Sequence, residues 1–125
     1  MDLERIARDY LRGLGFTCEF YAPASIPESL VTVKRTSRPG STRFEGRAML
    51  TVQAWADARG SAGELCGDAV SALVGRGRYE SAGGLASADA DITGCFPENG
   101  PYRWDDPDIK DRSRWQATVS VDYNE

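Results

Sequence analysis

The chain has 125 residues, of which 41% are hydrophobic and 27% are charged, as expected of one globular domain with enough apolar content to fold. Its formal net charge of -4 at pH 7 has the wrong sign for a protein that coats nucleic acid, and no apolar run approaches the roughly 20 residues that cross a membrane. Histidine, the commonest general base and metal ligand, is absent. We therefore expect a single domain over residues 1–125 that is not an enzyme, binds no cofactor or metal and contacts no membrane.

The first predicted helix covers residues 3–14. Its apolar residues recur every three or four positions and so form one stripe, which consists of Leu3, Ile6, Ala7, Tyr10, Leu11 and Leu14. Asp2 is in position to cap the start of the helix, and Gly13 and Gly15 end it. A short strand is expected over residues 16–21, followed by a connection that contains Pro23 and Pro27.

A hairpin of two strands follows. Residues 30–34 are β-branched and apolar enough for a strand, and the segment 37–42 is typical of a flexible hairpin tip. The returning strand, residues 44–57, places on one face Phe44, Ala48, Leu50, Val52, Ala54 and Ala56. Met49 and Trp55 fall on the other, polar face, so we expect that face to be partly covered.

The second predicted helix begins at a capping box formed by Ser61 and Glu64 and ends near Gly75. Apolar residues at helical spacing follow the box, namely Ala62, Leu65, Cys66, Ala69, Val70 and Leu73. Gly63 and Gly67 weaken this helix by roughly 1 kcal/mol each. Either another part of the chain packs closely against them, or they lie on an exposed face where nothing selects against glycine.

The last third of the chain begins with a glycine-rich turn over residues 75–84. A strand is expected over residues 86–93, and then a loop that contains Pro97, Gly100, Pro101 and Pro107. The terminal strand is clearer, because alternate residues are apolar, namely Trp115, Ala117, Val119, Val121 and Tyr123. Together these elements predict an α+β domain: an antiparallel or mixed β-sheet with the two amphipathic helices packed on one face.

Two carboxylate clusters are candidates for chemical sites. The first consists of Asp105, Asp106, Asp108 and Asp111; it lacks the spacing of a calcium loop, and a solvated acidic turn or a salt-bridge surface between subunits is the better interpretation. Asp89 and Asp91 would share one side of a strand, as an acid and base pair would. Exposed strand carboxylates are far commoner, so neither cluster predicts catalysis.

The hairpin is locally basic, with Lys34, Arg35, Arg38, Arg43 and Arg47 opposed only by Glu45. Three interpretations are open for these side chains: contact with phosphates, contact with an acidic surface on a neighbouring subunit, or no more than a charged hairpin tip in solvent. Of the two contacts, the acidic surface suits the negative net charge better. Aromatic residues are also numerous, with three tryptophans and five tyrosines. Large aromatic side chains favour both cores and interface centres.

Several segments of the chain resemble the small tail terminator proteins of siphophages that infect actinobacteria. They are Leu30-Val-Thr-Val-Lys-Arg-Thr, Ala48-Met-Leu-Thr-Val-Gln-Ala-Trp-Ala, the helix after Ser61, Pro101-Tyr-Arg-Trp-Asp-Asp-Pro-Asp, and Arg114-Trp-Gln-Ala-Thr-Val. The resemblance spans roughly the whole chain beyond the first helix. It rests on a pattern of strands and aromatic residues, without a catalytic motif.

The resemblance implies a subunit of the virion tail that is assembled in the cytoplasm of the host bacterium, a compartment that also suits three widely spaced cysteines. Such subunits form a ring, usually hexameric, that binds the tail tube protein, stops its polymerisation and offers a surface to a head completion or neck protein. DNA would meet the ring only in passage. The hairpin, with Gln53, Trp55 and Gln116 from the polar face, is the candidate contact surface with a neighbour or the tube.

Two other functions stay open at this stage. A head completion or neck protein would share the size and the ring. A small nucleic-acid-binding module would use the basic hairpin.

Overall fold

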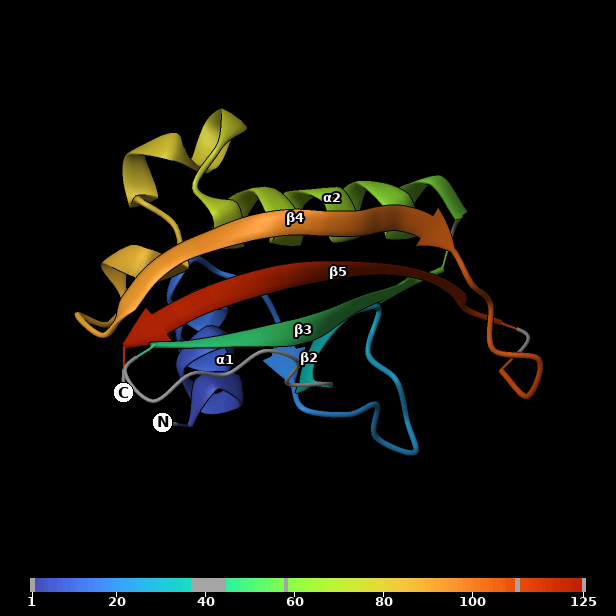
Figure 1. Ribbon diagram of the computed structural model, residues 1–125. Helices are drawn as coiled ribbons and strands as arrows, with labels where there is room; N and C mark the ends of the chain where they lie inside the picture. Colours follow the sequence, from blue (N-terminus) through green and yellow to red (C-terminus); the bar gives the residue numbers. More distant parts are fainter. Residues whose placement is uncertain (1, 37–44, 58, 110, 125) are drawn as a thin grey trace.

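The computed structural model describes residues 2–36, 45–57, 59–109 and 111–124, and only the backbone of Glu45 and Arg59. Five strands form one mixed sheet in the order β1-β2-β3-β5-β4, in which β1 is parallel to β2 and the other neighbours are antiparallel. In chain order the elements are α1 (Leu3–Gly13), β1 (Cys18–Glu19), β2 (Ser29–Arg35), β3 (Glu45–Ala56), α2 (Arg59–Val74), the 3-10 turns η1 (Gly77–Ala82) and η2 (Leu85–Ser87), β4 (Ile92–Arg103) and β5 (Ser113–Asn124). Figure 1 shows β3, β5 and β4 as long curved strands with α2 running alongside them.

Both helices pack on one face of this sheet, which we call the inner face. The predicted apolar alternation of β3 and β5 is confirmed, because Ala48, Leu50, Val52, Val119 and Val121 are all fully buried there. They share one core cluster with buried residues of α1 and α2. The α+β architecture predicted from the sequence is therefore confirmed.

The ends of α1 follow the predicted signals. The side chain of Asp2 accepts a hydrogen bond from the backbone N–H of Arg5 at 3.2 Å, which caps the first turn. Leu3, Ala7 and Leu11 are the buried part of the predicted stripe. The short strand expected after this helix is reduced to Cys18–Glu19.

The start of α2 was predicted wrongly. The helix begins at Arg59, so Ser61 is its third residue and cannot be its N-cap. Its end is as expected, because Gly75 follows Val74 with φ at +82°, a conformation that glycine adopts without strain. Of the two helical glycines, Gly63 faces Trp115, and a Cβ there would lie 3.1 Å from the ring, whereas a Cβ on Gly67 would meet nothing within 4 Å.

The strand predicted over residues 86–93 is also wrong. Residues 85–87 form the turn η2, and β4 starts only at Ile92 and continues to Arg103 through Pro97 and Pro101, where a loop was expected. Proline is compatible with β4 because this strand lies at the edge of the sheet and carries three register shifts against β5. The predicted hairpin tip at 37–42 lies outside the described residues.

Candidate interface on the outer face of the sheet

The face of the sheet opposite the helices, called the outer face here, is mostly polar. Its side chains come from alternate positions of β2, β3, β5 and β4, and they include Thr32, Lys34, Met49, Thr51, Gln53, Gln116, Thr118, Ser120 and Tyr102. Most of these are intermediate in exposure, between buried and fully solvated. The sequence pattern therefore placed Gln53 and Gln116 on the correct face.

A row of hydrogen bonds crosses this face from β2 to β4. Gln53 Nε2 donates to Gln116 Oε1 at 2.8 Å, and Gln116 Nε2 donates to the hydroxyl of Tyr102 at 2.9 Å. At the other end, Thr32 Oγ1 makes a longer contact of 3.5 Å with Gln53 Oε1. The row, called the amide ladder below, joins four strands without a charged group.

Trp55 lies on the outer face, but its side chain is buried. It is 3% exposed and its register partner Leu30 is 1% exposed. The guanidinium of Arg114 lies 5.1 Å from the centre of the Trp55 ring, an arrangement that adds a cation–π attraction to the burial. The expectation that the polar face is partly covered is confirmed here, and in this conformation Trp55 is not accessible to a neighbour.

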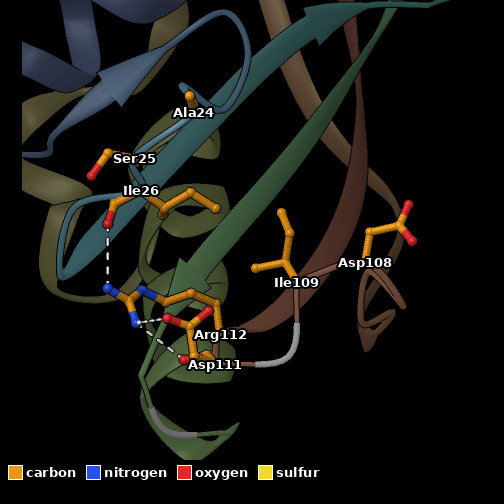
Figure 2. Close-up of a pocket in the computed structure, with 7 residues that line it drawn as sticks. All are labelled: Ala24, Ser25, Ile26, Asp108, Ile109, Asp111 and Arg112. Carbon is orange, nitrogen blue, oxygen red and sulfur yellow. Dashed lines mark hydrogen bonds and ion pairs between the residues drawn. The ribbon is translucent and has the colours of Figure 1, made fainter.

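Two loops approach one another beyond this end of the face. Arg112 Nη2 donates to the carbonyl oxygen of Ile26 at 3.3 Å, and Arg112 Nη1 lies 3.1 Å from the carboxylate of Asp57. Between the loops is a crevice of about 370 Å³, with Ile26 and Ile109 on opposite sides, as Figure 2 shows. The contacts of Arg112 therefore join the loop before β2 to the loop before β5.

The described basic residues of the hairpin do not form one patch. Arg35 Nη2 donates to the hydroxyl of Tyr123 at 2.8 Å, and its guanidinium lies 5.6 Å from that ring, which places Arg35 on the inner side of the sheet. Arg47 pairs with Asp122 through two contacts of 2.8 and 3.3 Å. Lys34 is exposed and makes no ion pair with any described residue. Arg38 and Arg43 lie outside the described residues.

The carboxylates of the loop after β4 are largely paired with arginine. Asp105 pairs with Arg103, and Asp106 with Arg114. Asp111 pairs with Arg112 and its side chain remains 81% exposed, while Asp108 has no ion pair within the described chain. No group of three potential metal-ligating side chains occurs among the described residues. The paired guanidiniums give this loop the character of a salt-bridged turn.

Asp89 and Asp91 do not share a strand, because β4 begins after them. The side chain of Asp89 instead accepts a hydrogen bond from the backbone N–H of Asp91 at 2.8 Å. This contact is typical of an Asx turn. The premise of a carboxylate pair on one strand face is therefore wrong.

The three cysteines are buried on the side of the sheet that the helices cover. Loss of solvent around them raises the pKa of Cys18, Cys66 and Cys95 to about 12 in each case. At neutral pH these thiols are therefore protonated and packed as small apolar groups.

Exposed aromatic side chains were not located by the sequence pattern. Tyr21 is 73% exposed, Trp104 53% and Phe96 46%. Trp104 packs beside Tyr102, with ring centres 5.9 Å apart. The only sequence signal for them was the high aromatic content, which by itself does not separate core residues from surface residues.

Comparison with protein-family models and with curated proteins returned no match. Among the described residues, no helix is long and apolar enough to span a membrane.

Proposed function

We propose that the protein is a structural subunit that forms a ring, caps a phage tail tube, stops its polymerisation and provides the surface to which the head is joined. The observation that carries this proposal is the exposure of Tyr21, Phe96 and Trp104 around an outer face that the helices leave uncovered. Large aromatic side chains at a surface are typical of protein contacts. The resemblance of the strands and of the Tyr102–Trp104 segment to siphophage tail terminators supports the particular role.

The edge strand β4 limits how such a ring would be built. Pro97 and Pro101 lack N–H donors, and the bulges of β4 break its edge at three points. Edges of this kind resist the addition of another strand. Subunits would therefore meet through side chains of the outer face and its flanking loops. Such contacts give a closed ring when the rotations from each subunit to the next add up to a full turn.

The direct test is a phage in which this gene is disrupted. Loss of a terminator gives overlong tail tubes, because nothing stops addition of the tube protein. Normal tails without heads would instead identify a head completion or neck protein. Normal virions with normal tails would contradict both roles, as would mass spectrometry of virions that finds no copy of the chain.

The nucleic-acid alternative is weaker for a specific reason. Arg35 and Arg47 are occupied by Tyr123 and Asp122, so two of the five basic hairpin residues already have partners within the chain. A gel shift of duplex DNA that weakens steeply as salt rises would support this alternative. No shift at physiological ionic strength, together with overlong tails, would leave the terminator proposal in place.

A further inference from the structure

The outer face carries a groove at the edge formed by β1 and β2. The segment Phe20–Ala22 forms one wall, and side chains of β2 and β3 form the floor, among them Thr32, Lys34 and Thr51. Its volume is about 280 Å³. One wall carries Tyr21, the most exposed large hydrophobic side chain in the described part of the protein, and Lys34 supplies an ammonium group without an ion pair to any described residue.

The loop that follows β4 also carries an exposed aromatic side chain, but its unpaired charge is negative. It carries Trp104, which is half exposed, and Asp108, a carboxylate without an ion pair among the described residues. Two hydrogen bonds hold the base of this loop: the backbone N–H of Trp104 donates to Arg114 O at 2.8 Å, and the side-chain Nε of Arg114 donates to Trp104 O at 2.6 Å. The indole ring is therefore held at the surface by ordered backbone.

The groove and the loop begin at different strands, but the loop does not stay at the β4 edge: Asp108 and Ile109 line the crevice of about 370 Å³ together with residues 24–26, which follow the groove wall in the chain. The groove borders β1 and β2 at one edge, whereas the loop leaves β4 at the other edge. They are also displaced along the strands, since the groove extends to Thr36 and the loop begins beyond the end of β3 that pairs with Ser113. Figure 1 shows the loop after β4, in orange, beyond one end of the sheet. Within one chain the loop therefore lines a crevice of its own, and none of the residues that line the groove belongs to the loop.

We infer that the groove between Phe20–Ala22 and Lys34 receives the loop 104–109 of a second copy of this chain, with Trp104 against the aromatic wall and Asp108 paired with Lys34. The argument for a second copy is complementarity: each patch supplies the aromatic surface and the unpaired charge that the other can use. Because the two patches consist of different residues, a copy can offer its groove to one neighbour and its loop to another, which makes the contact heterologous. This inference rests on the proposed function, for which it supplies the contact between subunits.

Charge reversal tests the contact in the purified full-length chain by sedimentation equilibrium. Lys34→Glu and Asp108→Lys should each raise the dissociation constant of the oligomer about tenfold or more, because each sets like charges together. The double variant restores opposite charges at every interface and should recover the oligomer. Arg76→Glu and Glu98→Lys change charge at exposed positions that belong neither to the groove lining nor to the loop, and they should leave the constant unchanged.

Cross-linking identifies the partners directly. The chain has only two lysines, Lys34 and Lys110, so a carbodiimide that joins amines to carboxylates has few products. In a mixture of unlabelled and heavy-nitrogen-labelled protein, mass spectrometry should find Lys34 joined to Asp108 of the other isotope. Lys34→Arg keeps the charge but does not couple, so it should retain the oligomer and lose this product.

The outcomes separate this inference from the function on which it rests. A chain that stays monomeric at millimolar concentration, or an oligomer indifferent to both charge reversals, overturns the inference. Recovery by the double variant together with the Lys34–Asp108 product supports it. Tail length in the disrupted phage is measured independently, so overlong tails with an unaffected oligomer would keep the terminator role and remove only this contact.

Discussion

The two faces of the sheet are built from the same strands but differ in the burial and the hydrogen bonding of their side chains. On the inner face, Leu50, Val52 and Val119 are fully buried against the helices and make no polar contact through their side chains. On the outer face, Gln53 and Gln116 are only partly buried and bond to one another. Because strand residues alternate in direction, one strand serves both faces at once. Stability therefore resides mainly in the inner face, which leaves the outer face available for contacts with other molecules.

Alkaline pH should have the largest effect, because it acts on three thiols of the inner side together. Their pKa is about 12 in the folded protein against an ordinary value of 9.0, so the folded state favours the neutral thiol. The stabilisation is complete below pH 9 and is lost as the pH rises towards 12. Urea unfolding at a series of pH values should show this loss. Cys66→Ala removes one contribution and should reduce the slope.

Truncation of the inner face should have the next largest effect. Leu50→Ala removes a side chain with no exposed surface and should lower the free energy of unfolding by about 2–5 kcal/mol. The matched control is the next residue, which points outward: Thr51→Val keeps the β-branched shape and should change stability by no more than about 0.5 kcal/mol. Equal losses at the two positions in urea unfolding would contradict the distinction between the faces.

Disruption of the amide ladder should cost less. Gln53→Ala removes the 2.8 Å hydrogen bond to Gln116 and should lower the free energy of unfolding by about 1 kcal/mol. Gln116→Ala also removes the bond to Tyr102. Because the two residues share one bond, the double variant should lose less than the sum of the single losses. Strict additivity in this double-mutant cycle would show that the ladder contributes nothing as a unit.

The smallest expected effect is a gain at the helical glycines. Gly67→Ala meets open space and should stabilise the protein by up to about 1 kcal/mol through helix propensity. Gly63→Ala should gain less, because its Cβ would lie 3.1 Å from the ring of Trp115. Thermal unfolding of the two variants compares them directly. A larger gain at Gly63 would mean that the Trp115 ring moves aside freely.

The elements with strict periodicity were predicted correctly. In β3 and β5, apolar residues occupy every second position for most of the strand, and burial of one face leaves only one compatible register. In α1, the apolar stripe and Asp2 define both the buried side and the start. The local pattern is sufficient in these cases, because the spacing of residues along one strand or helix fixes which side chains share a face.

The prediction was wrong where neighbours in space decide the conformation. Pro97 and Pro101 are typical of a loop, yet they lie in β4, because an edge strand needs hydrogen bonds on only one side. Arg35 was grouped with the basic hairpin, yet it bonds to Tyr123, which is 88 residues away in the chain. The candidate contact residues were therefore only partly foreseeable, since a sequence pattern gives the face of a strand but not the partner of a long side chain.

Residue spacing along single segments was sufficient to predict the α+β class, the two helices, the inner faces of β3 and β5 and the polar character of the outer face. The packing of the whole chain, by contrast, makes β4 an edge strand, covers Trp55 and leaves Tyr21 and Trp104 exposed. The physical reason is that exposure depends on which distant segments lie above a side chain, and that follows from the packing of the whole chain.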